Sequence, residues 1–329
     1  MIEMNNSSPT TLYIIGNGFD LHHKLNTSYR SFGLFLRENQ PELYEYLLKY
    51  LGFPNLDEKD EDGIWANFEV SLANLEFEAI IDEHLEYAAD IGSGDFSDGD
   101  WNTIAIYMKQ IRNNLTDNLF GSFKEFILNV DYPKIGNDTL IKIEENSIFL
   151  TFNYTKSLEL YYGISQEQIL HIHNKAESED TLILGHGIDP ETFEQEEVKP
   201  PEGLSEDELS QWEERQNDNY NFSIELEKSE LMQYFKNSFK PTHEIIEHYE
   251  NFFMQLKSIS KVYVLGHSIS DIDFPYLEKI VSAIGSDKTE WFVSYYKPEE
   301  AEDRWQKLLD LNLGKDQIKL IKMAELIKG

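Results

Sequence analysis

The stretch GNGFDLHHK, residues 16–24, follows the apolar run LYII and combines a glycine-rich turn with an acidic side chain. A strand that ends in glycine and leads into a helix presents free backbone N–H groups, which bind phosphate. We therefore predict nucleotide contacts at four residues of this turn, Gly16, Asn17, Gly18 and Phe19. Asp20 follows them, although a carboxylate competes with phosphate for the start of a helix.

Two roles for Asp20 stay open. As a helix N-cap it would accept a backbone N–H of the first turn. As a catalytic residue it would accept hydrogen bonds from ribose hydroxyls or from an amide group of a ligand. The adjacent His22 and His23 point in different directions on a helix and do not form a metal pair. Thr27 and Ser28 indicate the start of a second helix.

A second candidate segment is FLTFNYTKSLE, residues 149–159. A predicted strand ends at Thr151, which places the Asn153 side chain at the carboxyl edge of the sheet, where nucleotides bind. An amide both donates and accepts hydrogen bonds, so Asn153 suits the positioning of water or of a ribose hydroxyl. We also predict a nucleotide contact at Thr151, which lies beside it. The alternative is that Asn153 only shapes the turn.

The third segment is LHIHNKAES, residues 170–178. Because His171 and His173 are two positions apart, they share one face of a strand. A single catalytic imidazole is the simpler interpretation, since histidine exchanges protons near neutral pH. A metal site would need further ligands, and His186 and Asp189 are the obvious ones. A buried structural histidine is the third alternative for either position.

The fourth segment is VLGHSISDIDFPYLEKI, residues 264–280, which again combines a strand, a turn of small residues and a helix start. Ser268 and Ser270 can cap that helix. Asp271 and Asp273 fall in its expected first turn. We predict ligand contacts from four residues of this segment, Gly266, His267, Ser268 and Asp271.

Short apolar runs rich in β-branched and aromatic residues predict the strands that position these turns. The predicted strands are 11–15, 147–151, 168–172, 181–184, 261–265, 290–295 and 317–321. Several of them end in glycine or a small polar residue and run into helical spacing. This alternation predicts an α/β fold with a Rossmann-like, doubly wound, mainly parallel sheet and with ligands at the carboxyl ends of the strands.

The domain prediction is one α/β domain over residues 1–329 with a large helical insertion at about 36–130. Apolar residues keep helical spacing there from Trp65 to Leu85 and from Ile104 to Leu119. The insertion is either a lid or additional packing. An acidic excursion at about 189–218 contains two consecutive prolines and leads into a helical pattern at about 222–259.

Composition narrows the class of function. The 329 residues carry a formal net charge of −33, which repels polyanions and makes a nucleic-acid partner unlikely. The chain has no cysteine, so disulfides and thiolate zinc sites are excluded and a reducing, cytoplasmic location is expected. No apolar stretch is long enough to span a bilayer, and no membrane association is expected.

The blocks YIIGNGFDLHHKLNTSY, FLTFNYTKSLE, LHIHN and LGHSISDIDFPYL resemble, in order and spacing, those of the AbiH family of bacterial phage abortive-infection proteins. The resemblance covers essentially the whole chain. IWANFEVSL, residues 64–72, looks like the W-x-x-[FY]-E block of that family, with Trp65 and Glu69. The resemblance implies an effector of phage defence.

More distantly, the same order of segments is similar to the sirtuin-like NAD hydrolases of phage defence. In those enzymes an asparagine and a histidine act on a Rossmann-like sheet, and by position they fall on Asn153 and His173, with His171 as the second candidate. The family usually has glycine after that histidine, where this chain has Asn174. The resemblance implies NAD⁺ as the substrate, nicotinamide and ADP-ribose as products, and no metal.

Two alternatives to an NAD⁺ hydrolase stay open. The first is a nucleotide sensor without catalysis, which would pass a signal to a partner. The second is a metal-dependent hydrolase or nuclease built on His171, His173, His186 and Asp189. In each case a small nucleotide is the expected ligand, and a homo-oligomer or an accessory defence protein is a possible partner.

Overall fold

A computed structural model describes residues 8–61, 63–76, 80, 98–193, 205, 209–210, 222–286 and 288–328. Its internal contacts divide the chain into two compact units. The first unit comprises Met1–Glu38, Gly121–Gly187 and Lys240–Gly329. The second comprises Asn39–Phe120 and Ile188–Phe239, so residues 39–120 of the expected insertion fall within it.

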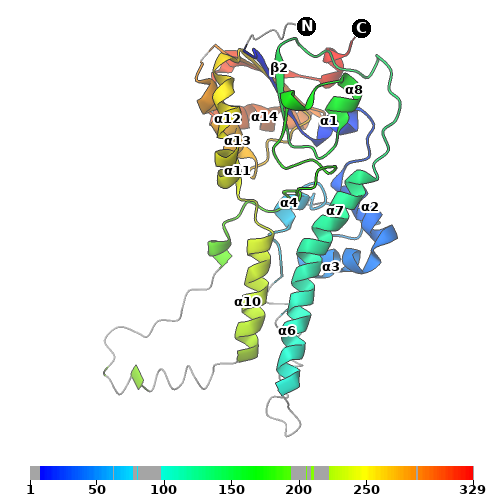
Figure 1. The fold of residues 1–329 in the computed structure, drawn as a ribbon, viewed down its shortest axis with the longest axis vertical. Helices are drawn as coiled ribbons and strands as arrows, with labels where there is room; N and C mark the ends of the chain where they lie inside the picture. The colour runs from blue at the N-terminus through cyan, green and yellow to red at the C-terminus, as the bar shows by residue number, and fades with distance from the viewer. Residues whose placement is uncertain are drawn as a thin grey trace. The chain divides into compact units, whose positions relative to one another are not determined.

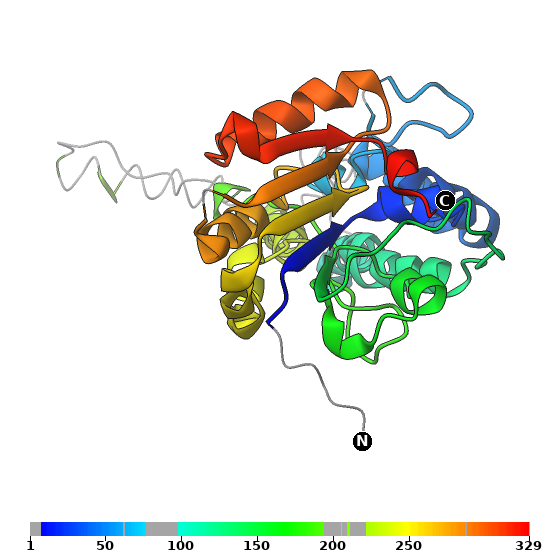
Figure 2. The same ribbon diagram turned by 90° about the horizontal axis from the view of Figure 1, so that it is seen from above.

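The first unit is built on a six-stranded sheet with the order β3-β2-β1-β4-β5-β6. Its strands are β1 Thr11–Ile15, β2 Ser147–Thr151, β3 Ile169–His171, β4 Lys261–Leu265, β5 Glu290–Ser294 and β6 Ile318–Ile321. Every neighbouring pair is parallel, as the arrows in Figure 2 show. The prediction of a Rossmann-like α/β fold is confirmed.

The register brings the carboxyl ends of four strands level with one another. Ile15 at the end of β1 pairs with Thr151 of β2 and with Leu265 of β4. Thr151 in turn pairs with His171 at the end of β3. The turns that follow these strands therefore start side by side at one edge of the sheet.

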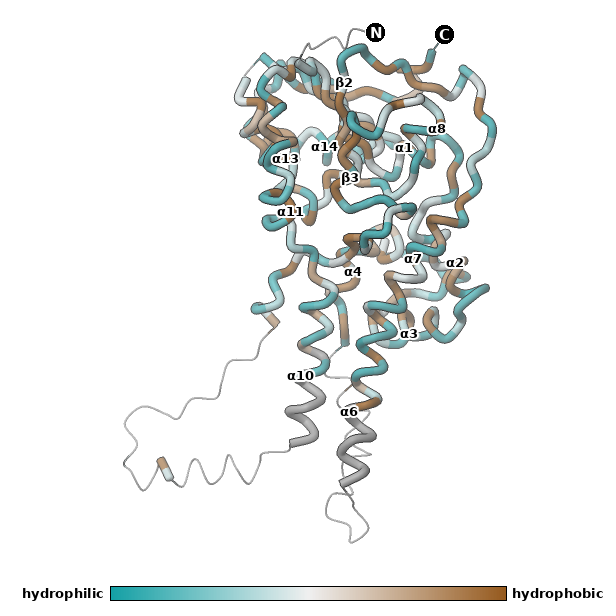
Figure 3. Tube along the Cα trace, viewed as in Figure 1, coloured by the Kyte–Doolittle hydropathy of each residue, from teal (hydrophilic) through white to brown (hydrophobic). Residues whose placement is uncertain are grey.

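The central strand β1 is buried along its whole length because both faces of the sheet are covered. Leu12 and Ile14 point into one apolar cluster, whereas Tyr13 and Ile15 point into a second cluster on the opposite face. The ring of Tyr13 stacks on that of Tyr263 with centroids 4.9 Å apart. Figure 3 shows the hydrophobic colouring of the trace around β2, the strand next to β1.

Helices cover both faces of this sheet (Figure 1). The cluster around Leu12 includes side chains of α11 Thr242–His248, α12 Glu250–Phe253, α13 Phe274–Ile284 and α14 Pro298–Asp310. The cluster around Tyr13 includes side chains of α1 Asn17–His22 and α8 Ser157–Tyr162. The remaining helical segments are α2 Tyr29–Asn39 and the 3-10 helices η3 Gln166–Gln168, η5 Met254–Ser258, η6 Lys315–Gln317 and η7 Met323–Leu326.

Two local predictions have different outcomes. The helix start at Thr27 and Ser28 is confirmed, because α2 begins at Tyr29 and the Ser28 Oγ accepts the backbone N–H of Ser31 at 3.1 Å. The strand at 181–184 is wrong. Leu182 and Leu184 are buried in a loop, so the apolar run there reports burial rather than pairing in a sheet.

The second unit is helical in the part that the structure describes. It contains α3 Pro41–Leu51, α4 Phe68–Ser71, α6 Asp98–Asn113, the π-helical η2 Asn114–Asn118, the 3-10 helix η4 Pro190–Phe193 and α10 Phe222–Asn237. From η2 the chain continues as α7 Leu119–Leu128 into the first unit. A salt bridge of 2.6 Å joins Arg112 of α6 to Glu230 of α10.

The helical spacing from Ile104 to Leu119 is confirmed by α6, η2 and the start of α7. The pattern at 222–259 is also helical, with an interruption at 238–241 that ends at Pro241. Of the spacing from Trp65 to Leu85, the described residues show α4 and a helical residue at Ile80. The acidic excursion at 189–218 lies mostly outside the described residues. Of the described helices, none has the length and apolar character needed to cross a membrane.

Candidate functional site

The turns after β1 and β4 pack directly on each other through three glycines. A Cβ atom on Gly16 would lie 2.5 Å from the Cα of His267, and one on Gly18 would lie 2.8 Å from the Cα of Gly266. Gly266 has a φ of +66°, and a Cβ there would lie 2.1 Å from the backbone N of Phe19. Only glycine permits this contact, so the glycines of both turns have a structural reason.

The same contact uses the backbone amides that we expected to bind phosphate. The N–H of Gly16 donates to Leu265 O at 3.0 Å, and that of Gly18 donates to Gly266 O at 2.8 Å. The N–H of Phe19 donates to Gly16 O at 2.9 Å. These three amides therefore already have acceptors within the chain. The Gly266 N–H likewise donates to the Oγ of Ser294.

The side chain of Asn17 contributes a further internal contact. Its Nδ2 donates to Thr27 O at 3.1 Å, and its Oδ1 accepts from the Thr27 hydroxyl at 2.6 Å. This pair of bonds fixes the loop that joins α1 to α2. His22 and His23 also have separate partners, since His22 Nε2 lies 2.9 Å from Thr139 O and His23 Nε2 lies 2.7 Å from the Tyr162 hydroxyl.

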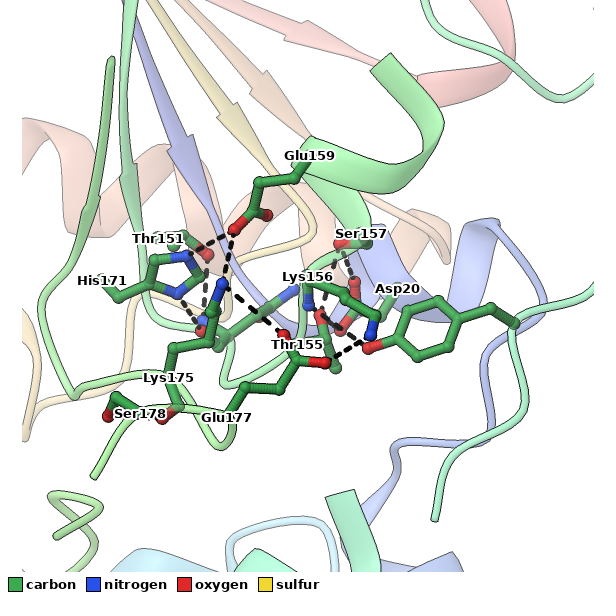
Figure 4. Close-up of polar contacts among 12 residues, drawn as sticks. Asp20, Thr151, Thr155, Lys156, Ser157, Glu159, His171, Lys175, Glu177 and Ser178 are labelled. Carbon is green, nitrogen blue, oxygen red and sulfur yellow. Dashed lines mark hydrogen bonds and ion pairs between the residues drawn. The ribbon is translucent and has the colours of Figure 1, made fainter. Parts of the chain in front are cut away.

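Asp20 is 1% exposed and lies inside α1, which has Gly16 as its N-cap residue. The N-cap interpretation of Asp20 is therefore wrong. Its Oδ2 accepts the hydroxyl of Thr155 at 2.7 Å, and its Oδ1 accepts the hydroxyl of Ser157 at 2.6 Å. Figure 4 shows both hydroxyls directed at the carboxylate. Asp20 thus joins the turn after β1 to the turn after β2.

Burial raises the pKa of the Asp20 carboxyl to about 6. The hydrogen bonds from Ser157, Thr155 and Asn153 oppose this rise, as does the more distant charge of His171. Hydroxyl and amide donors stabilise a buried carboxylate less than a neighbouring cation does, so the rise prevails. Asp20 therefore changes its charge close to neutral pH.

Asn153 lies at the expected place, two residues beyond the end of β2, and is 6% exposed. Its Nδ2 donates to Gly16 O at 3.1 Å, and its backbone N–H donates to the Thr151 hydroxyl at 3.1 Å. The ring Nδ1 of His171 lies 3.2 Å from Asn153 O. The structure therefore brings Asn153, Asp20, Thr151 and His171 together.

A chain of alternating charges extends from His171 (Figure 4). Its Nε2 lies 3.6 Å from the Oε1 of Glu159, and the same oxygen accepts from Lys175 Nζ at 3.0 Å. Glu177 then contacts both Lys175 and Lys156. Although burial alone would raise the pKa of Glu159, the contacts from His171 and Lys175 lower it to about 2.

His173 belongs to a different group of side chains. It is 2% exposed, and its ring lies against those of Phe152 and Tyr276 at centroid distances of 5.2 and 5.6 Å. Among the described residues, no atom lies within hydrogen-bonding distance of its Nε2. Burial and the charge of Lys240 hold the pKa of His173 well below its usual range, so the imidazole is neutral.

Asp273 is the centre of this second group. Its Oδ1 lies 3.4 Å from Lys240 Nζ and 4.0 Å from His173 Nε2. Its Oδ2 accepts the Ser270 hydroxyl at 2.9 Å and lies 3.4 Å from His267 Nε2. Burial alone would raise the pKa of Asp273, but the positive charge of Lys240 and the His267 contact lower it far below its usual value. Asp273 is therefore ionised at neutral pH.

The family model for the bacteriophage abortive infection protein AbiH matches residues 12–295, which include all the strand-end turns described above. The chain belongs to the AbiH family. The resemblance seen in the sequence blocks is thereby confirmed, whereas the sirtuin-like similarity stays a prediction. A comparison with curated protein sequences gives no match.

Asn174, which stands after His173 where the resemblance leads us to expect glycine, has a backbone explanation. Asn174 has a φ of 66°, which lies in the left-handed region that favours glycine. Asparagine is among the few other residues that adopt this conformation readily, so the turn is kept. The Asn174 side chain donates through Nδ2 to Thr181 O at 2.7 Å.

The metal interpretation of the histidines finds no support among the residues that the structure describes. No three histidine, aspartate or glutamate side chains there are placed to hold one metal ion. β3 ends at His171, so His173 lies in the following turn and the two rings do not share a strand face as expected. Their partners differ accordingly.

Sequence reasoning missed two residues of this AbiH site, Lys240 and the central role of Asp273. Lys240 is 1% exposed and was the least expected residue to be buried, since an isolated lysine in a loop gives no signal. Asp273 was expected in the first turn of a helix, but α13 begins one residue later, at Phe274. The predicted ligand contacts Ser268 and Asp271 are exposed, with the side chain of Asp271 at 96%.

Proposed function

We propose that this AbiH chain acts in abortive infection by hydrolysing NAD⁺ to nicotinamide and ADP-ribose. The position of Asn153 supports this proposal most. Asn153 lies at the carboxyl edge of a sheet with the strand order 3-2-1-4-5-6, and its side-chain amide donates a hydrogen bond to Gly16 O. In sheets of this order, nucleotides bind outside the carboxyl ends of the strands. The two polar groups described above flank Asn153 at that edge.

The chemistry matches such a site. In NAD⁺ the nicotinamide nitrogen is already cationic, so the bond from C1′ of the ribose breaks without an acid catalyst. Water then adds to C1′ and loses a proton, and the site must hold the ribose and orient this water. The amide oxygen of Asn153 is suited to orient the water, since its Nδ2 is already committed to Gly16 O.

A histidine is the proposed acceptor of the proton from this water. The sirtuin-like resemblance in the sequence points to His173, and the neutral state of that imidazole suits a base. The geometry favours His171, because its side chain is 14% exposed compared with 2% for His173, and because its Nδ1 contacts Asn153 O. Replacement of each histidine by asparagine in turn separates the two assignments.

The test is release of nicotinamide from NAD⁺ by the purified chain, together with cellular NAD⁺ during phage infection, which supplies any activating signal. An Asn153→Ala variant should lower turnover by about 10²- to 10³-fold, because one oriented polar group is lost from the site. Asn251→Ala, at an exposed position of α12, is the matched control. Equal NAD⁺ loss in infected cells carrying the parent or the Asn153→Ala chain would remove this role for Asn153.

A second candidate function is a nucleotide sensor without turnover. It is favoured by the closed contact between the turns after β1 and β4, whose amides at Gly16, Gly18 and Phe19 already have acceptors within the chain. A sensor would bind ADP-ribose or NAD⁺ measurably in calorimetry and release no nicotinamide in uninfected or infected cells. The same two assays therefore separate the candidates.

A further inference from the structure

The carboxylate of Asp20 is already occupied by the protein itself. Both of its oxygens accept hydroxyl hydrogens, one from Thr155 and one from Ser157, at 2.7 and 2.6 Å. Thr155 and Ser157 are 4% and 2% exposed, so the whole contact lies away from solvent. A ligand at the sheet edge would meet Asn153 before it could meet Asp20.

The contact spans two turns that are far apart in the sequence. Ser157 lies 137 residues after Asp20 along the chain. Asn153 makes the parallel link from the same turn, since its Nδ2 reaches Gly16 O, four residues before Asp20. Residues 153–157 are thus held at both ends against residues 16–20.

We infer that Asp20 is a positioning residue, which fixes the 153–157 turn against α1 and thereby holds Asn153 at the sheet edge without touching a ligand. The inference takes from the proposed function only the role of Asn153. It replaces the catalytic role that the sequence predicts for Asp20.

The groups that face Asp20 bear on how its charge depends on pH. They are the imidazole of His171 and the hydroxyls of Tyr132 and Tyr161. Burial, and after it the charge of Asp20, raises the pKa of each of the two tyrosines. Because burial raises the pKa of Asp20 to about 6, its carboxyl takes up a proton just below neutral pH. Because the folded state favours the neutral acid, the link in the parent should not loosen as pH falls through this range.

Asp20→Asn tests the inference, because asparagine has nearly the same shape but removes the charge and replaces one of the two acceptor oxygens by an amide donor. Hydrogen exchange of the peptide that covers residues 149–160 should become faster in this variant, whereas in the parent it should be no faster at pH 5 than at pH 8 after correction for intrinsic rates. Thr155→Val removes one donor from the opposite side and should have the same effect. Asp316→Asn, an exposed residue, is the control.

The kinetics of nicotinamide release give a second measurement, which would not change if Asp20 only stabilised the fold. Asp20→Asn should lower kcat for nicotinamide release by about 10- to 100-fold with KM little changed, since misplacement of a catalytic group affects the chemical step. The double variant with Thr155→Val should lose no more than either single variant, because both changes break the same link. The global unfolding midpoint should not fall.

Each result decides a different question. Unchanged exchange in residues 149–160 of Asp20→Asn and Thr155→Val would overturn the inference, whatever the activity. Faster exchange with no nicotinamide release by the parent would leave Asp20 as a positioning residue and remove the proposed hydrolase. A rise in KM with unchanged kcat would show that Asp20 contacts the ligand, and would overturn the inference. If Asp20→Asn does not fold, Thr155→Val and Ser157→Ala provide the same comparison.

Discussion

The two polar groups at the carboxyl edge of the sheet each contain one aspartate of low exposure, and the pKa values of the two carboxyls shift in opposite directions. Asp20 has hydroxyl and amide donors as partners, and burial raises its pKa to about 6. Asp273 lies 3.4 Å from the Nζ of Lys240, and its pKa falls far below the usual value although burial acts on it too. A cation within contact distance therefore decides the direction of the shift.

The difference gives the two groups different tasks. The group around Asp273 keeps a fixed charge pair at every pH near neutrality, which suits a constant scaffold. The group around Asp20 changes its charge in the physiological range, which suits an adjustable contact. Phe152 and Asn153 are consecutive in the chain and contact different groups. The ring of Phe152 lies against His267 in the group around Asp273, whereas Asn153 donates to Gly16 O in the turn that leads to Asp20.

The largest effect is expected from Lys240→Met, which removes the cation from Asp273. A buried carboxylate without its partner should cost about 3–5 kcal/mol of unfolding free energy, measured by urea denaturation. Because the parent carboxyl has a lowered pKa, its contribution is present above the unfolded pKa and is lost as pH falls. In the variant this acid-labile contribution should disappear.

The double variant Lys240→Met with Asp273→Leu is the control for that prediction. Replacement of both charges should recover much of the loss, because no unpaired charge stays buried. An additive loss in the double variant would show that Lys240 and Asp273 contribute independently, and the contrast with Asp20 would then lose its electrostatic basis.

Gly266→Ala tests the close backbone contact between the turn after β1 and the turn after β4. The new Cβ would lie 2.1 Å from Phe19 N at a φ of +66°, so strain and steric overlap together should cost about 2–4 kcal/mol in thermal or urea unfolding. Gly163→Ala, with a φ of +64° and no atom within 4 Å of the added Cβ, should cost about 1–2 kcal/mol. Equal losses would mean that the two turns separate easily.

Asp20→Asn should change the free energy of unfolding by less than the preceding variants do. At high pH it should increase that free energy, whereas the preceding variants decrease it. The folded pKa of about 6 lies above the ordinary value of 3.8, so the folded state binds more protons between these values and parent stability falls as pH rises through this range. At pH 8 the variant should equal or exceed the parent by about 1–3 kcal/mol, whereas near pH 4 the difference should vanish. Urea unfolding across pH 4–8 measures this, and a parent that gains stability over the same range would contradict it.

Asn174→Gly should have the smallest effect, within about 1 kcal/mol of the parent, because relief of the positive φ is offset by loss of the hydrogen bond to Thr181 O. This variant places the glycine expected from the resemblance beside His173. A large gain in nicotinamide release without a change in stability would show that the asparagine side chain restricts the site.

Much of the fold could be predicted from short segments, because strand and turn signals are local. All six strands were expected within one residue of their observed ends. The error at 181–184 has a local cause, since a buried loop and a buried strand share the same apolar composition. Within the site, the place of Asn153 followed directly from the end of its strand.

The sequence by itself determined the alternation of strands and helices, the AbiH blocks, and the residues that follow each strand, because each depends on neighbours within a few positions. Tertiary structure alone decided the partners. Asp20 meets Ser157 across 137 residues and Asp273 meets Lys240 across 33, and no local pattern specifies which polar side chains converge. The charge of a carboxylate held away from solvent depends on those partners, so only the fold decided the direction in which the pKa of each carboxyl shifts.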